Sequence, residues 1–433
     1  MSDRLKDALS RIDRVQPAIT RGRVTALSGI VLRIAGLGLR VGDQVRILRD
    51  GDPLAAEVVA FQGQEAVALP LDEPHGVGPD SLVERVDAPE LYCGEGLLGR
   101  VLDGQGAPLD GRSLPAGLEC WPLHRPAPEP LSRPRISQPI SLGVRVLDGL
   151  LTAGEGQRIG LFAGSGVGKS TLLGWIARRC DADVCVVCLV GERGREVRDF
   201  VEESLGEGLS RSVVFCATGD MAPMLRLRCV EAATSVAEYF RERGKRVLLL
   251  VDSITRYARA LREIGLAAGE APARRGYPPS VFARLPRILE RSGMSANGSI
   301  TAIYTVLVEG SDMEEPIADE VRGILDGHVV LSRELAERHH FPAIDVSASL
   351  SRVMTAVTSD AHQLAASRVR QLLATYEQNR ELIILGAYRK GSDPRVDQAI
   401  AMMPKIEAFL RQRVDERSDL DSAASALAAL LDV

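Results

Sequence analysis

The chain has 433 residues, of which 45% are hydrophobic and 26% charged, and its formal net charge is −5. This length allows two or three domains with a large core, and the composition is ordinary for a soluble globular protein. The charge balance excludes a general attraction to nucleic acid or anionic lipid, and no apolar run approaches the roughly 20 residues of a membrane span. Because the N-terminus also lacks the apolar core of a signal peptide, we expect a cytoplasmic protein.

The N-terminal part of the chain predicts a short helix followed by a small β domain. Apolar residues recur at helical spacing over residues 2–16, before Pro17, which indicates an amphipathic helix that either caps its own domain or docks on a partner. Over residues 18–87, β-rich runs alternate with Gly, Asp and Pro turns, which is typical of a small barrel or sandwich. The runs are residues 22–27, 30–34, 44–48, 55–61 and 66–70.

An oligonucleotide-binding barrel should carry aromatic and basic side chains on which bases stack. Phe61 is the only aromatic residue before Tyr92, so we favour a structural role for this domain.

The rest of the chain changes from β-rich to alternating to helical. Residues 94–118 read as a turn-rich β segment, and the six prolines of residues 122–139 predict an extended connection. Strands and helices alternate from about 140 to 350, which indicates an α/β domain with a mainly parallel sheet. After about residue 356 the patterns are helical, and we expect a C-terminal helical domain with helices over residues 361–378, 397–413 and 420–431.

A phosphate-binding loop stands at the start of the α/β domain. Residues 158–171 read R-I-G-L-F-A-G-S-G-V-G-K-S-T, a strand, a glycine loop, Lys-Ser and the start of a helix. Ala163 replaces the first glycine of the strict pattern, which the loop can tolerate because three glycines remain. We expect Lys169 to reach the β- and γ-phosphates of a nucleotide and Ser170 to ligate Mg²⁺, at the positive end of the helix.

Hydrolysis also needs an anchored magnesium ion and a group that activates water. The apolar run at residues 246–251 ends in Asp252, which is the Walker B arrangement and places the carboxylate near the Mg²⁺ held by Ser170. Asp252 could also cap the helix predicted over residues 254–263, and both roles can coexist.

A second acidic candidate follows the strand predicted over residues 183–190. Residues 191–196 read G-E-R-G-R-E, and a carboxylate at the end of the strand beside the phosphate loop can reach the water that attacks the γ-phosphate. Glu192 is the catalytic candidate, and Arg193 is poised for phosphate charge. From composition alone, a solvated mixed-charge turn is an equal alternative.

Five longer motifs resemble the secretion and flagellar branch of the F1-type rotary ATPases. They are G-E-R-G-R-E-V (191–197), D-S-I-T-R-Y-A-R-A (252–260), R-R-G-Y-P-P-S-V-F-A-R-L-P (274–286), G-S-I-T-A-I-Y-T-V-L-V-E-G (298–310) and I-L-D-G-H-V-V-L-S-R (324–333). The resemblance implies an N-terminal helix (1–17), a β-barrel (18–90), a RecA-like ATPase domain (91–355) and a C-terminal helical domain (356–433). It also implies a ring of six copies that binds ATP and Mg²⁺ at subunit interfaces.

The same resemblance implies roles for single residues. Glu192 matches the catalytic glutamate, Arg193 a phosphate-contacting arginine, and Asp252 the Walker B acid. Phe341, in H-F-P-A-I-D, matches an aromatic residue that stacks on adenine, and Arg352, in S-L-S-R-V, matches the arginine finger that a neighbouring subunit inserts. The implied nucleotide-contacting set is Gly164, Ser165, Gly166, Val167, Gly168, Lys169, Ser170, Thr171 and Phe341.

Two members of this branch compete: the ATPase of a needle-type (type III) injectisome and the flagellar export ATPase. A-G-S-G-V-G-K-S at 163–170 is similar to the flagellar loop, whereas the stretches at 237–250, 263–270 and 309–316 favour the injectisome. Either reading implies a ring peripherally associated with the cytoplasmic face of the inner membrane, at the mouth of an export-gate membrane protein. The implied partners are chaperone–substrate complexes, a central stalk protein, and a stator protein bound by the N-terminal helix.

Three other functions are open to such a fold. A catalytic subunit of a rotary F/V-type ATP synthase would use the same chemistry, and the stretches at 191–197 and 277–282 argue against it by resemblance. A nucleic-acid translocase would need an aromatic, basic barrel, so we expect no nucleic-acid partner. A subunit that only holds nucleotide would not need the carboxylate of Glu192.

Overall fold

The structure is a computed structural model that describes residues 20–86, 90–308 and 312–431. The helix predicted over residues 2–16 lies outside this part of the chain. The described residues form two compact units, one built on the N-terminal strands together with residues 222–224 and 263–271, and one that contains the rest. The domain boundaries given above remain predictions.

The N-terminal strands form a closed antiparallel barrel, with the strand order β1-β2-β5-β4-β3-β6. Alternation of side chains fills its core: in β2, Leu32 and Ile34 point inward and are almost fully buried. The predicted barrel is therefore confirmed, and the alternative of a sandwich is wrong. The strands are β1 (Arg21–Ser28), β2 (Val31–Ala35), β3 (Gln44–Ile47), β4 (Leu54–Gln62), β5 (Glu65–Pro70) and β6 (Leu82–Val86).

Strand β6 was not among the predicted runs, although it closes the barrel by pairing with both β1 and β3. Only Val83 of this strand is fully buried, so its apolar signal is weak. Backbone pairing rather than a hydrophobic pattern makes it a strand.

A nine-stranded sheet forms the centre of the second unit, with the order β19-β18-β12-β17-β15-β13-β14-β8 and β16 paired to β17. The strands from β18 to β8 are parallel, and β19 runs antiparallel at one edge. The central strands β13 and β17 are buried along almost their whole length because helices cover both faces of the sheet. The nine strands of this sheet are β8 (Arg100–Leu102), β12 (Arg158–Ala163), β13 (Val184–Glu192), β14 (Ser212–Thr218), β15 (Arg246–Asp252), β16 (Gly293–Met294), β17 (Ser299–Leu307), β18 (Gly327–Leu331) and β19 (Ile344–Ser351).

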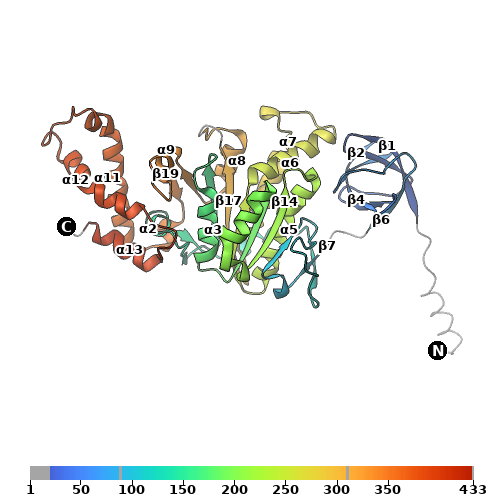
Figure 1. Ribbon diagram of the computed structural model, residues 1–433, viewed down its shortest axis with the longest axis horizontal. Coiled ribbons are helices and arrows are strands. Elements are labelled where there is room, and N and C mark those ends of the chain that lie inside the picture. Colours follow the sequence, from blue (N-terminus) through green and yellow to red (C-terminus); the bar gives the residue numbers. More distant parts are fainter. Residues whose placement is uncertain (1–19, 87–89, 309–311, 432–433) are drawn as a thin grey trace. The chain divides into compact units, whose positions relative to one another are not determined.

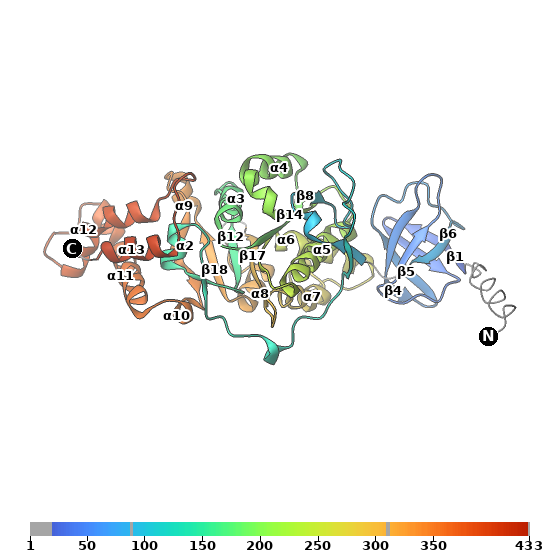
Figure 2. The ribbon, with the colours of Figure 1, turned by 90° about the horizontal axis from the view of Figure 1, so that it is seen from below.

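Helices flank this sheet, with α3 and α4 on one side and α7 and α8 on the other (Figures 1 and 2). The helices up to the end of the sheet are α2 (Arg145–Leu150), α3 (Lys169–Arg179), α4 (Gly194–Asp199), α5 (Pro223–Glu242), α6 (Ile254–Ala267), α7 (Pro279–Leu289), α8 (Pro316–Ile324) and α9 (Arg333–Glu337). Two small pairs of strands, β7 (Glu90–Cys93) with β9 (Glu119–Pro122) and β10 (Pro139–Ile140) with β11 (Ala153–Gly154), complete the β structure. The α/β prediction is confirmed.

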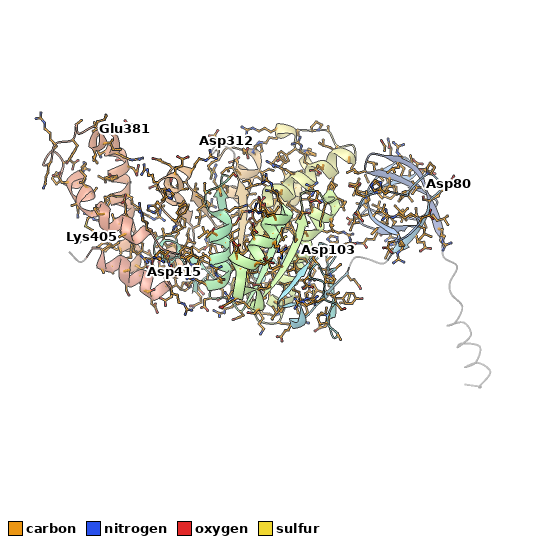
Figure 3. The ribbon with its side chains drawn as sticks, in the orientation of Figure 1. Asp80, Asp103, Asp312, Glu381, Lys405 and Asp415 are labelled. Atoms are coloured by element: carbon orange, nitrogen blue, oxygen red, sulfur yellow. The ribbon has the colours of Figure 1, made fainter. Side chains whose placement is uncertain are left out.

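The last part of the chain is helical, as expected, and shares one hydrophobic core with the sheet. It contains α10 (Met354–Val357), α11 (Asp360–Ile384), α12 (Pro394–Leu410) and α13 (Leu420–Ala429). Figure 3 labels Glu381 on α11, Lys405 on α12 and Asp415 on the loop between α12 and α13. Helix α2 packs on this bundle at Gly149, where a Cβ atom would lie 2.8 Å from the ring of Phe409.

No helix within the described residues is both long and apolar enough to cross a membrane.

Candidate active site

The phosphate loop connects β12 to α3, as predicted. Gly166 and Gly168 have φ values of 79° and 85°, in the left-handed region that favours glycine. Gly168 is the N-cap residue of α3, and no side chain caps the helix there. The first turn of an 11-residue helix therefore presents backbone N–H groups and its positive end at the loop, which is the arrangement that binds phosphate.

Lys169 lies between two buried carboxylates. Its Nζ atom is 2.5 Å from Oδ1 of Asp252 and 3.6 Å from Oε1 of Glu192. Asp252 ends β15, and its Oδ1 also accepts a hydrogen bond of 2.7 Å from Thr305 Oγ1. The three predicted residues Lys169, Glu192 and Asp252 thus meet in one cluster at the carboxyl edge of the sheet, where ligands of open α/β sheets bind.

The strand that carries Glu192 is not adjacent to the phosphate loop, so this detail of the prediction is wrong. Strand β13 is separated from β12 by β17 and β15. Consecutive strands in the chain are not neighbours here, because β15 and β17 insert between them. The extended side chain of Lys169 spans the distance and still approaches Glu192.

The environment of Glu192 favours a carboxyl group that titrates near neutrality. Burial raises the pKa of Glu192 to about 7, helped by a hydrogen bond to Glu196 and by the nearby charge of Asp252. Lys169 and Arg256 oppose this rise. Oε1 of Glu192 is buried without a hydrogen-bond partner, so it can accept one from a bound molecule.

Arg256 is a member of this cluster that the sequence analysis did not single out. Its Nη2 atom lies 3.2 Å from Oε2 of Glu192. It lies in the first turn of α6, whereas Glu192 ends β13, so no local spacing in the sequence marked the contact between them.

Two further predicted residues, Ser170 and Arg193, lie beside the lysine–carboxylate cluster and are exposed. Ser170 is exposed in the first turn of α3, next to Lys169. The side chain of Arg193 is 86% exposed, and its Nη1 atom lies 3.7 Å from Oε1 of Glu196. The structure therefore does not bring Arg193 into contact with the lysine–carboxylate cluster.

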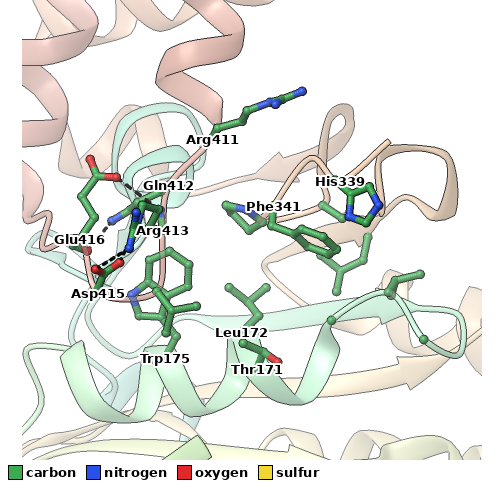
Figure 4. Close-up of a pocket in the computed structure, with 17 residues that line it drawn as sticks. Thr171, Leu172, Trp175, His339, Phe341, Arg411, Gln412, Arg413, Asp415 and Glu416 are labelled. Carbon is green, nitrogen blue, oxygen red and sulfur yellow. Dashed lines mark hydrogen bonds and ion pairs between the residues drawn. The ribbon is translucent and has the colours of Figure 1, made fainter. Parts of the chain in front are cut away.

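Phe341 lines a cavity of about 760 Å³ next to the phosphate loop. The floor is formed by residues 166–168 together with Thr171 and Trp175 of α3, and Phe341 faces residues 411–416 across it (Figure 4). Phe341 is 43% exposed, and its ring lies against Gly168. The segment 411–416 was not predicted as part of the site, because a polar loop between two helices carries no periodic signal.

Arg352 lies near the amino ends of the parallel strands, whereas the phosphate loop of its own chain lies at their carboxyl ends. Leu331 of β18 pairs with Ala163, the last residue before the loop. Strand β19 runs back along β18, so that Ser351 pairs with Gly327. The two ends of β18 are four residues, roughly 13 Å, apart. Arg352 is exposed and directly follows Ser351.

This fold and this cluster define a P-loop ATPase domain with a C-terminal helical extension. Residues 143–351 match the ATP synthase alpha/beta family, nucleotide-binding domain. Residues 358–429 match the T3SS EscN ATPase C-terminal domain.

Relatives match over nearly the whole chain. It is 49% identical over 449 residues to the flagellum-specific ATP synthase of Salmonella typhimurium, covering 99% of this chain and 98% of that protein. It is 50% identical over 416 residues to the type 3 secretion system ATPase of Xanthomonas euvesicatoria, covering 95% and 94%. The chain therefore belongs to the family of type 3 secretion system ATPases and flagellum-specific ATP synthases, and it is an ATPase.

Solved structures agree with this family and with the fold. The assembled ATPase EscN from the enteropathogenic E. coli type III secretion system superposes with a TM-score of 0.90 at 44% identity, covering 95% of this chain and 100% of that chain. EscN in complex with its central stalk EscO gives a TM-score of 0.88, at the same identity and coverage. The predicted family and the RecA-like, F1-type fold are confirmed.

Proposed function

We propose that this chain is the ATP-hydrolysing motor of a type III protein secretion apparatus, which releases chaperones and unfolds substrates at the export gate. The observation that carries the proposal is the placement of Lys169 Nζ between the carboxylates of Asp252 and Glu192, beside a phosphate loop. Holding a triphosphate and activating water require such a combination.

Nucleotide binding uses the phosphate loop and the cavity beside it. The backbone of residues 164–168, Thr171 and the start of α3 bind the phosphates, and Lys169 turns from Asp252 towards the β- and γ-phosphates. Phe341 stacks on the adenine ring, which its exposed ring at the cavity wall supports.

Mg²⁺ fits the residues present. Magnesium at nucleotide sites is held by one or two protein oxygens plus waters and phosphates, and the hydroxyl of Ser170 with the carboxylate of Asp252 forms such a set. The absence of any cluster of three or more His, Cys, Asp and Glu side chains in residues 20–86, 90–308 and 312–431 is compatible with this mode. When bound, the ion neutralises charge on the phosphate oxygens.

Glu192 orients the attacking water and accepts its proton at Oε1, the buried oxygen without a hydrogen-bond partner. Arg256 acts as a positioning residue through its contact with Oε2 of Glu192. Arg193 directly follows Glu192, and its side chain is exposed. It contacts the phosphates once it turns from Glu196 towards the nucleotide.

Arg352 acts on the nucleotide of a neighbouring copy in a hexameric ring. Arg352 and the phosphate loop of the same chain lie at opposite ends of the parallel strands, which supports action in trans. The similarity to the assembled ATPase EscN supports it as well. In trans, the guanidinium group stabilises charge on the transferring phosphoryl group only when two subunits meet.

Mixing two inactive variants tests this arrangement. Arg352→Ala and Glu192→Gln should each be nearly inactive alone, but a random mixed ring contains complete interfaces at roughly one position in four. We therefore expect the mixture to hydrolyse ATP well above the sum of the separate proteins, and wild-type specific activity to rise with protein concentration. A mixture no more active than that sum, in rings shown to contain both variants, contradicts a finger in trans.

The remaining partners follow from the family. A central stalk protein is supported by the complex of EscN with its central stalk EscO. A stator protein bound by residues 2–16, an export-gate membrane protein and chaperone–substrate complexes complete the proposed set, at the cytoplasmic face of the inner membrane.

A flagellar export ATPase is the second candidate, because relatives of both kinds match at nearly the same identity. A pull-down of tagged Glu192→Gln protein from native cells with ATP separates the two, with Lys169→Ala protein as the control in which nucleotide binding is weakened. We expect mass spectrometry to identify injectisome gate, stator and chaperone proteins. Flagellar counterparts would replace the injectisome reading, and proton-motor subunits or RNA would overturn the export function.

A further inference from the structure

The loop between α12 and α13 forms the wall of the nucleotide cavity that faces Phe341, and it contains one buried polar side chain. Gln412 is only 5% exposed, whereas its neighbours Arg411 and Arg413 are exposed. A buried amide in a surface loop is costly unless its hydrogen bonds are made. The partners of Gln412 therefore show what the side chain is for.

Gln412 connects three separate segments of the chain. Its Oε1 atom accepts a hydrogen bond of 2.7 Å from the backbone N–H of Arg145, and its Nε2 donates one of 3.1 Å to the carbonyl of Glu416. Its backbone N–H donates to the carbonyl of Phe341, also at 3.1 Å. One residue thus links the start of α2, the loop that carries Phe341, and the far end of its own loop.

The contact with Arg145 has a clear physical reason. Helix α2 begins after Val144, which has no side chain able to cap it. The first N–H groups of a helix need partners, and the amide oxygen of Gln412 supplies one from 267 residues away in the chain. The loop is therefore tied to α2, which precedes the phosphate loop in the chain and packs on the C-terminal bundle.

Arginines of α2 and α3 hold the same loop. Arg179, at the end of α3, donates to the carbonyls of Val414 and Glu416, and its guanidinium group lies 5.3 Å from the ring centroid of Trp175. Arg145 forms an ion pair with Glu416. These contacts support the loop from α2 and α3, and the backbone N–H of Gln412 connects it to the loop that carries Phe341.

We propose that Gln412 is a positioning residue for the nucleotide base, which fixes the spacing between Phe341 and the facing loop. This proposal rests on the proposed function, because it takes the cavity to be the base site. Gln412 acts through the wall it organises, so its loss should weaken binding of the base and leave the phosphate site intact.

A comparison of ADP with pyrophosphate tests the proposal on the full-length protein. Gln412→Leu removes both side-chain hydrogen bonds at similar volume, and Gln412→Glu keeps the acceptor for Arg145 but sets a carboxylate oxygen against the carbonyl of Glu416. By titration calorimetry we expect the Kd for ADP to rise about tenfold in both variants. The Kd for pyrophosphate, which has no base, should stay within about twofold of wild type.

The same substitutions at Gln105, an exposed residue that does not line the cavity, serve as matched controls and should change neither Kd. The proposal is overturned if the ADP affinity of a folded Gln412 variant equals that of wild type. It is also overturned if the affinities for ADP and pyrophosphate fall in parallel, since that result indicates general destabilisation. If Gln412→Leu does not fold, Gln412→Glu decides.

Failure of the proposed function has a different signature. In that case pyrophosphate and ADP would bind wild-type protein and Lys169→Ala protein equally, whatever residue occupies position 412.

Discussion

Replacing Glu192 with glutamine should leave ATP binding intact and lower turnover by roughly two or more orders of magnitude. Glutamine has the same shape and can still contact Arg256, but an amide cannot take a proton from water. The substitution also removes a carboxylate that lies 3.6 Å from Lys169 Nζ, so phosphate binding should not suffer. Steady-state phosphate release and nucleotide titration on the same preparation measure the two effects separately.

Glu203→Gln is the matched control, because this glutamate is exposed in the short π-helix Phe200–Leu205 that follows α4 and takes no part in the cluster. It should hydrolyse ATP at the wild-type rate. Near-normal turnover in Glu192→Gln would rule out the catalytic role and leave Asp252 as the acid to test next. Loss of ATP affinity in that variant would instead point to a structural role.

Replacing Lys169 with alanine should weaken nucleotide binding itself, by roughly ten- to a hundredfold, and abolish measurable turnover. The ammonium group is the cation that stands against both Asp252 and Glu192, and it would carry the contact with the β- and γ-phosphates. Without it, two buried carboxylates face the approaching triphosphate and repel it. Titration with ATP and ADP measures the loss.

Lys245→Ala provides the control for this experiment, because the side chain of that lysine is 42% exposed and lies 4.0 Å from Glu95, away from the cluster. It should bind ATP as the wild type does. Unchanged affinity in Lys169→Ala would count against the phosphate-loop assignment. The melting temperatures of both variants show whether Asp252 and Glu192, left without the ammonium group, also destabilise the fold.

The sequence by itself determined the local parts of this site. The phosphate loop needs only consecutive residues: an apolar strand, glycines able to take positive φ, and Lys169 at the first position of a helix. Asp252 and Glu192 could be placed for the same reason, because each directly ends a buried apolar strand. Phe341 and Arg352 followed only from resemblance, since nothing in their own surroundings distinguishes them.

The tertiary structure decided what depends on packing between distant segments. Which strands are neighbours could not be predicted, because β12, β13, β15 and β17 are all apolar runs with no local mark of their partners. The same limit hid the closing strand β6, whose pairing is made by the backbone. It also hid Arg256 and the loop around Gln412, because polar side chains acquire a role only when folding brings their partners to them from other elements.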